Sequence, residues 1–281
     1  MTVTIYHGDN LSVMRGLPDA SFGLVYLDPP FNTGRVRERA VESASTPRDA
    51  PLPGSVTRRG FHGRDYERLR GDLRVYDDRF DDYWGFLEPR VLEAWRLLAD
   101  DGTLYLHLDY REAHYAKVLL DAVFGRDHFL NEIIWSYDYG AKTRKRWPTK
   151  HDTILVYVKD PAHYWFDSEA VDREPYMAPG LVTPEKAARG KLPTDVWWHT
   201  IVPTTGREKT GYPTQKPEGV LRRIVQASSR LGGAVLDPFA GSGTTGAVAQ
   251  GLGRDAVLID ANPDAIAIMQ ERMPLATIIE S

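Results

Sequence analysis

The sequence predicts an α/β protein with a doubly wound, mostly parallel sheet. Short apolar runs rich in strand-forming residues alternate with segments whose apolar residues recur every three or four positions, as in amphipathic helices. A glycine-rich turn joins one such run to a helix at residues 237–246. A chain of 281 residues with 42% hydrophobic content is large enough to form a buried core, and we expect a single domain over 1–281.

The first predicted element is a buried strand at 21–28, which runs into a loop stiffened by two prolines. The next segment, at about 34–72, is rich in Arg, Pro, Gly, Ser and Thr and has little apolar periodicity, which predicts a mobile basic loop. Apolar residues at helical spacing from Trp84 to Leu98 predict a helix over 81–98. A strand at 103–108 and a helix at 112–123 follow.

The second half continues the alternation. Further strands are expected at 131–136, 152–158, 234–237, 256–260 and 277–279. Further helices are expected at 218–229, 244–250 and 263–272. The stretch at about 137–212 is interpreted as an inserted recognition region, because residues 160–212 contain six prolines and show no sustained period.

Composition excludes several classes of protein. The chain has no cysteine, which excludes disulfides, thiolate metal sites and cysteine nucleophiles, and we expect no metal. The formal net charge of −4 argues against a surface uniformly covered by positive charge. No apolar run approaches the roughly 18 residues of a membrane span, and no signal peptide is evident, so a cytoplasmic location is expected.

The glycine-rich turn, Asp237 to Gly246, has the form that brings backbone close to a nucleotide-like ligand. Asp260 ends the next strand, where a carboxylate can bind both hydroxyls of a ribose. The letters GSGTTG also fit a dinucleotide fingerprint, so a nicotinamide-dependent oxidoreductase is an alternative. However, Asp237 would repel a pyrophosphate and is better suited to a cofactor that carries an ammonium and a sulfonium.

A second motif, Asp28, Pro29, Pro30 and Phe31, lies at the end of the first predicted strand. The prolines fix the backbone and leave the Pro29 carbonyl free as an acceptor. Asp28 supplies a second acceptor, so the pair can hold both hydrogens of an exocyclic amine and direct its lone pair at a methyl carbon. Phe31 offers a ring on which an extruded base can stack.

With this tetrapeptide placed about 210 residues before the glycine-rich turn, the chain resembles the DNA amino-methyltransferases of the β class. Segments at Gly8–Asn10, Leu97–Gly102 and Tyr212–Pro217 also resemble that family. The resemblance implies a circularly permuted, Rossmann-like methyltransferase fold with a seven-stranded, mostly parallel sheet that has one antiparallel strand. It also implies S-adenosylmethionine as cofactor, double-stranded DNA as substrate, a homodimer, and room for a cognate restriction endonuclease.

The resemblance assigns roles residue by residue. The catalytic set is Asp28, Pro29, Pro30 and Phe31. The cofactor set is Asp9, Asn10, Asp28, Thr214, Lys216, Asp237, Pro238, Phe239, Ala240, Gly241, Ser242, Gly243, Thr244, Asp260, Ala261 and Asn262. Lys216 and Thr214 are expected at the methionyl end, and Asp260 stands where relatives often have glutamate.

The contacts with DNA are expected from cations interleaved with aromatics, which can neutralise phosphates and stack on bases. The candidates are Arg35, Arg37, Arg39, Tyr139, Lys142, Arg144, Lys145, Arg146, Trp147 and Lys150. On DNA the protein would be associated with the nucleoid.

The target atom is expected to be N6 of adenine, because the aspartate that heads the tetrapeptide is typical of adenine enzymes. Cytosine N4 is the alternative, whereas C5 methylation needs a thiolate that the chain lacks. Methylation of a protein glutamine or of RNA, and a DNA-binding module without activity, are more distant alternatives.

Overall fold

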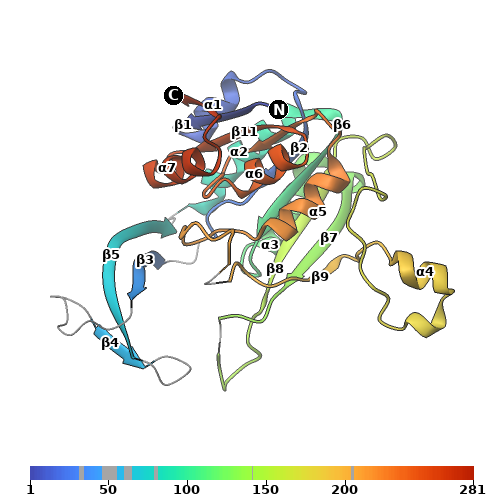
Figure 1. Ribbon diagram of the computed structural model, residues 1–281. Helices are drawn as coiled ribbons and strands as arrows, with labels where there is room; N and C mark the ends of the chain where they lie inside the picture. The colour runs from blue at the N-terminus through green and yellow to red at the C-terminus, as the bar shows by residue number, and fades with distance from the viewer. Residues whose placement is uncertain (32–34, 46–55, 60–64, 79–81, 141, 204–205) are drawn as a thin grey trace.

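The protein is built around one twisted sheet (Figure 1). The computed structural model describes residues 1–31, 35–45, 56–59, 65–78, 82–140, 142–203 and 206–281. Within these ranges the main sheet has nine strands, ordered β12 (Thr277–Glu280), β1 (Val3–His7), β11 (Asp255–Asp260), β10 (Ala234–Asp237), β2 (Phe22–Leu27), β6 (Leu98–Leu108), β8 (His151–Val158), β7 (Phe129–Ser136) and β9 (Val196–Trp198). Among these nine, β8 alone runs antiparallel to the rest.

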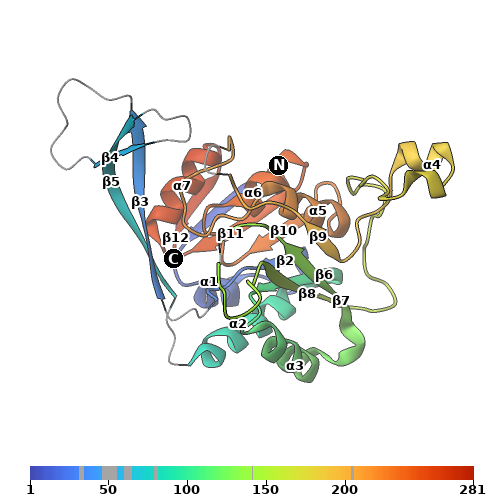
Figure 2. The same ribbon diagram turned by 90° about the horizontal axis from the view of Figure 1, so that it is seen from below.

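Helices cover both faces of the sheet (Figure 2). One face packs against α1 (Asn10–Gly16), α2 (Tyr83–Leu97) and α3 (Ala113–Phe124). The other packs against α5 (Glu218–Ser228), α6 (Thr244–Gly251) and α7 (Pro263–Arg272). Successive strand residues alternate between the two cores, as in β2, where Leu24 and Tyr26 join one core and Val25 and Leu27 the other.

The topology places a crevice between β10 and β2. These strands are parallel neighbours. From β10 the chain continues through α6 to β11 on one side, and from β2 it continues to β6 on the other. Open α/β sheets bind ligands at the carboxyl ends of strands that diverge in this way. The two sequence motifs, which follow β2 and β10, therefore lie side by side.

The predicted fold class is confirmed, with a different strand count. All seven predicted strands form, and the single antiparallel strand was predicted correctly. The two additional strands are β1 and β9. β1 lies between β11 and β12, where pairing on both sides stabilises its five residues, and β9 adds three residues at the far edge beside β7. Such short strands have too few residues to show a period of their own.

The basic segment after Phe31 differs from the expected irregular loop. β3 (Arg35–Ser45), β4 (Val56–Arg59) and β5 (Asp65–Asp78) form an antiparallel sheet in the order β3-β5-β4. The prediction was wrong for these residues because ladder hydrogen bonds join backbone groups and require no apolar period. The rest of 34–72 lies outside the described residues, and the predicted mobility stays a prediction.

The inserted region at 137–212 is mostly irregular. It contains β8, η2 (Pro179–Leu181), α4 (Pro184–Arg189) and β9, while η1 (Arg126–His128) precedes it. Among the residues described above, no helix is both long and apolar enough to cross a bilayer.

Candidate active site

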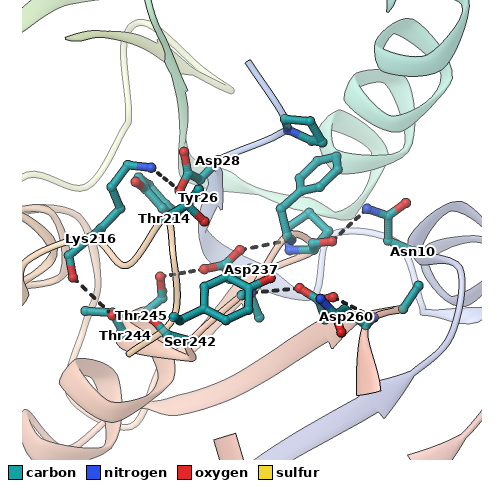
Figure 3. Close-up of a pocket in the computed structure, with 18 of the residues that line it drawn as sticks. Asn10, Tyr26, Asp28, Thr214, Lys216, Asp237, Ser242, Thr244, Thr245 and Asp260 are labelled. Carbon is teal, nitrogen blue, oxygen red and sulfur yellow. Dashed lines mark hydrogen bonds and ion pairs between the residues drawn. The ribbon is translucent and has the colours of Figure 1, made fainter. Parts of the chain in front are cut away.

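A cavity of about 210 Å³ opens at the carboxyl ends of β1, β11, β10 and β2 (Figure 3). Every residue predicted to bind the cofactor lines it except Gly243. From the tetrapeptide, Asp28 and Pro30 line it as well, while Pro29 is buried behind them. The two motifs that the sequence places far apart thus form one site.

Asp28 has one carboxylate oxygen in use and one free. Lys216 Nζ lies 2.5 Å from Asp28 Oδ2, and only 11% of the lysine side chain and 14% of the aspartate side chain are exposed. Asp28 Oδ1 is buried and has no hydrogen-bond partner among the described residues. A buried acceptor without a donor is unfavourable, so this oxygen is suited to an N–H group of a ligand. Lys216 Nζ also lies 4.8 Å from the centre of the Phe31 ring. The lysine is therefore close to both Asp28 and Phe31 of the tetrapeptide.

Asp237, the acid that begins the glycine-rich turn, is almost fully buried. Its Oδ2 accepts a hydrogen bond from the Thr245 hydroxyl at 2.6 Å, and its Oδ1 accepts one from the Phe239 N–H at 3.0 Å. Burial raises the pKa of Asp237 to about 7, and the nearby charges of Asp28 and Asp260 add to that effect. Near neutral pH Asp237 is therefore close to the midpoint of its titration, and a cationic neighbour would favour its ionised form.

Gly241 and Gly243, two glycines of the turn, have different surroundings. Gly241 and Gly243 adopt positive φ of 50° and 71°, which side chains disfavour. A Cβ on Gly241 would lie 3.0 Å from the Tyr212 ring at the cavity wall. A Cβ on Gly243 would lie 2.6 Å from Met269 and 2.9 Å from Met273. Gly243 thus lets the turn pack against α7 and against Met273, which follows that helix. Its proposed contact with the cofactor stays a prediction.

Asp260 is fixed by backbone donors at the end of β11. Its Oδ2 accepts from the Gly241 N–H and its Oδ1 from the Asn262 N–H, each at 2.8 Å. Burial raises the pKa of this carboxyl, and these hydrogen bonds oppose the rise. The Asp260 carboxylate lines the cavity, where it could also accept from a ligand hydroxyl.

The opposite wall is built on Asp9, Asn10 and Arg90. Asp9 caps α1 by accepting from the Ser12 N–H at 3.0 Å. The Asn10 amide donates to the Pro238 carbonyl at 2.7 Å, and its Oδ1 accepts from Arg90 Nε at 2.6 Å. Arg90 also bonds Asp9 at 2.8 Å. This arrangement joins the loop after β1 to the glycine-rich turn.

The cavity has lining residues that sequence reasoning missed, namely Tyr26, Phe86, Arg90, Leu221 and Thr245. The sequence could have indicated Arg90, because it lies three residues after Leu87 and four before Ala94, on the apolar face of α2. A cation at such a position needs a partner in the interior.

The residues predicted to contact DNA lie away from the cavity lining. Tyr139 is 62% exposed and Trp147 is 93% exposed, and the neighbouring cations Lys142, Arg144, Lys145 and Arg146 are exposed as well. Lys150 is partly buried and pairs with Asp138 at 2.7 Å. Arg35, Arg37 and Arg39 fall on β3, where the structure describes the backbone alone.

The site combines four acids, Asp9, Asp28, Asp237 and Asp260, with two cations, Arg90 and Lys216, around a cavity. Such a cavity favours a cationic ligand, and the free Asp28 Oδ1 favours a hydrogen-bond donor beside it. The model of the DNA methylase family that covers N6 and N4 methyltransferases matches residues 22–271, most of the chain. The chain belongs to this family.

Two kinds of similarity accompany the family match of this DNA methylase. The chain is 29% identical over 282 residues to a protein of Escherichia coli (strain K12) named DNA adenine methyltransferase YhdJ, covering 98% of this chain and 83% of that protein. The fold is similar to that in the crystal structure of an M1.HpyAVI–SAM complex (TM-score 0.60, 19% identity, 97% and 99% of the two chains). It is also similar to the cytosine-N4-specific PvuII DNA methyltransferase (TM-score 0.65, 14% identity, 97% and 86% of the two chains).

Membership of the DNA methylase family confirms the predicted enzyme class, a DNA amino-methyltransferase, and with it the predicted cofactor class. It removes the nicotinamide-dependent alternative. The residues present fit a sulfonium cofactor, because the cavity carries an excess of carboxylates and the glycine-rich turn exposes backbone to it.

Proposed function

We propose that the chain transfers the methyl group of S-adenosylmethionine to the exocyclic N6 of adenine in a specific sequence of duplex DNA, after extruding that base. The observation that carries the proposal is Asp28 Oδ1, a buried acceptor without a donor among the described residues, on a side chain that lines the same cavity as the glycine-rich turn. An exocyclic amine supplies the missing N–H.

In this mechanism Asp28 Oδ1 accepts one hydrogen of the amine and the Pro29 carbonyl accepts the other, so that the nitrogen lone pair points into the cavity. Pro30 keeps the loop rigid, and Phe31 stacks on the base. The bound cofactor supplies an electrophilic methyl group on a cationic sulfur. With that cofactor bound, Asp28 would stabilise the positive charge that develops on the amine nitrogen as it is methylated, until the extra proton is lost to solvent.

The cofactor roles follow the cavity wall. Asp260 is proposed to accept from the ribose hydroxyls, Asp9 and Asn10 to flank the adenine ring, and Asp237 to attract the cationic end. Pro238, Phe239, Ala240, Gly241, Ser242, Thr244, Ala261 and Asn262 complete that wall. Lys216 and Thr214 are proposed for the methionyl end. Lys216 Nζ lies 2.5 Å from Asp28 Oδ2. The lysine would therefore either contact the methionyl carboxylate and Asp28 together, or leave Asp28 when it binds the methionyl carboxylate.

Adenine is favoured over cytosine by the aspartate that heads the tetrapeptide and by the name of the E. coli relative. The PvuII enzyme, named as specific for cytosine N4, keeps the second candidate open. The segment at 137–150 is proposed to hold the DNA, with Trp147 and Tyr139 stacking and the cations meeting phosphates. A homodimer, a cognate restriction endonuclease and a cytoplasmic location stay predictions.

The test is to methylate unmethylated, amplified genomic DNA with the purified protein and to map modified bases by single-molecule sequencing. We expect N6-methyladenine in one sequence context and no methylation with Asp28→Ala. N4-methylcytosine would replace the adenine assignment, and absence of any methylated base with S-adenosylmethionine present would overturn the proposed function.

A further inference from the structure

A chain of hydrogen bonds runs through the interior beside the cavity. The Tyr26 hydroxyl lies 2.7 Å from His107 Nδ1, and His107 Nε2 lies 3.3 Å from Asp152 Oδ2. The Tyr137 hydroxyl donates to Asp152 Oδ1 at 3.0 Å. His107 is fully buried, and none of the roles proposed above uses it. Burial of a polar side chain is unfavourable unless its hydrogen bonds are satisfied, so the interactions of His107 indicate what it does in the core.

The direction of these hydrogen bonds follows from Asp152. Burial alone would raise the pKa of this carboxyl, but bonds from His107 and Tyr137 and the charge of Lys216 lower it. An ionised carboxylate accepts only, so His107 Nε2 donates a hydrogen bond to Asp152 Oδ2. The Tyr26 hydroxyl, 2.7 Å from His107 Nδ1, belongs to the same chain of hydrogen bonds. Figure 3 shows Tyr26 next to Asp28 in the cavity wall.

His107 also supports the ring proposed to stack on the target base. The centres of the His107 and Phe31 rings are 5.8 Å apart, with the planes at 39°. The Trp135 ring packs edge-on against His107, with the two ring centres 5.5 Å apart. His107 lies on β6, the neighbour of β2. One side chain therefore contacts Tyr26 and Phe31, which stand before and after Asp28 in the chain.

The other end of the chain of hydrogen bonds is the segment at 137–150. The Tyr137 N–H donates to the Lys150 carbonyl at 3.0 Å, which joins the two ends of the segment. Between them stand the exposed Tyr139 and Trp147. A displacement of this segment on binding would move Tyr137, and Tyr137 shares the carboxylate of Asp152 with His107.

We propose that His107 is a positioning residue for methyl transfer, which holds Tyr26 and Phe31 around Asp28, and that Asp152 and Tyr137 link it to the DNA-contacting segment. The inference rests on the proposed function and deepens it. The segment that holds DNA then also sets the geometry in which the extruded base is received.

Three variants test this. His107→Gln removes the ring that supports Phe31, and Tyr137→Phe removes one hydroxyl from a residue that does not line the cavity. The matched control is Tyr157→Phe, because Tyr157 is a buried tyrosine on β8 whose hydroxyl donates to Asp121 at 2.7 Å, in the core on the other face. The readouts are kcat for transfer of labelled methyl groups to unmethylated genomic DNA, Kd for S-adenosylmethionine, and fluorescence of 2-aminopurine at the mapped target position.

We expect His107→Gln to lower kcat about 100-fold through misplacement of the base and Tyr137→Phe to lower it about fivefold through loss of one hydrogen bond. In both, Kd for S-adenosylmethionine stays within about twofold, and the 2-aminopurine signal changes because the base is held differently. Tyr157→Phe should keep kcat and the fluorescence of the wild type. Tyr137→Phe added to His107→Gln should cause no further loss.

The inference is overturned if the wild-type protein is active and Tyr137→Phe matches it in kcat and fluorescence. It is also overturned if Tyr157→Phe loses as much activity as Tyr137→Phe, since the loss would then follow from reduced stability. A wild-type protein that methylates no DNA rejects the proposed function instead. Should His107→Gln fail to fold, Tyr137→Phe and its control still decide.

Discussion

Asp237→Asn tests whether the cavity stores electrostatic free energy for a cationic cofactor. Asp237 is 2% exposed, and its carboxylate accepts from the Phe239 N–H and the Thr245 hydroxyl. Asparagine can keep both contacts, since its Oδ1 accepts from Phe239 and its Nδ2 can donate to the Thr245 oxygen. The substitution therefore removes the charge without leaving a void or an unpaired group.

The size of the effect follows from the pKa of Asp237. Burial, with smaller contributions from Asp28 and Asp260, raises it from the ordinary 3.8 to about 7. Below pH 3.8 the group is protonated whether the chain is folded or not, and no penalty exists. As the pH rises toward 7 the unfolded chain ionises first and the folded state loses stability, by about 4 kcal/mol once the pH exceeds 7 and by less than half of that at pH 5.

The assay is urea unfolding of the ligand-free wild type and variant at several pH values from 5 to 8, with calorimetric titration of S-adenosylmethionine at pH 8. Asp237→Asn should be the more stable protein, by a margin that grows with pH, and should bind the cofactor at least about tenfold more weakly because an attraction to its cationic groups is lost. Stability and affinity thus change in opposite directions.

The control is Asp121→Asn. Burial would raise the pKa of Asp121, but bonds from Lys117 and Tyr157 lower it, so its charge stabilises the fold and the variant should lose stability. If Asp237→Asn is no more stable than the wild type at pH 8, or if its margin does not grow with pH, the reasoning about the buried charge is refuted.

Three further predictions concern single side chains. Asp28→Ala should lower kcat at least about 1000-fold while Kd for S-adenosylmethionine stays within about threefold; activity near that of the wild type would contradict the catalytic role. Gly243→Val should lower the free energy of unfolding by about 3 kcal/mol, from strain at positive φ and collision with Met269 and Met273; in urea unfolding, an unchanged midpoint would count against this packing. Trp147→Ala should weaken DNA binding about tenfold in a fluorescence anisotropy titration and leave cofactor binding unchanged, and equal DNA affinity would remove Trp147 from the interface.

The sequence predicts those parts of the site that are local in the chain. Asp28 and Asp237 could be placed because each stands at the end of an apolar run, and parallel strands align such ends. The partners could not be placed in the same way. Lys216 meets Asp28 across 188 residues and Arg90 meets Asn10 across 80, and such pairs depend on tertiary packing that no local pattern records.

Two further features of the structure could not be predicted from local sequence patterns. A glycine in a turn signals that a Cβ is excluded, but the sequence does not say by what, and at Gly243 a Cβ would meet Met269. The sheet of β3, β5 and β4 was missed because its strands pair with one another through backbone hydrogen bonds, which an arginine-rich sequence with little apolar periodicity does not reveal.

The glycine-rich turn by itself does not distinguish a nicotinamide dinucleotide from S-adenosylmethionine, because both need close approach of backbone at the start of a helix. The acids around it make the distinction. A pyrophosphate beside α6 would face Asp237 and Asp260 and would raise the pKa of Asp237 further, so binding would require proton uptake into a buried site. A sulfonium and an ammonium lower that pKa instead and relieve the charge that folding has buried. We therefore expect Asp237, the residue that ends β10, to select the charge of the ligand that the turn accepts.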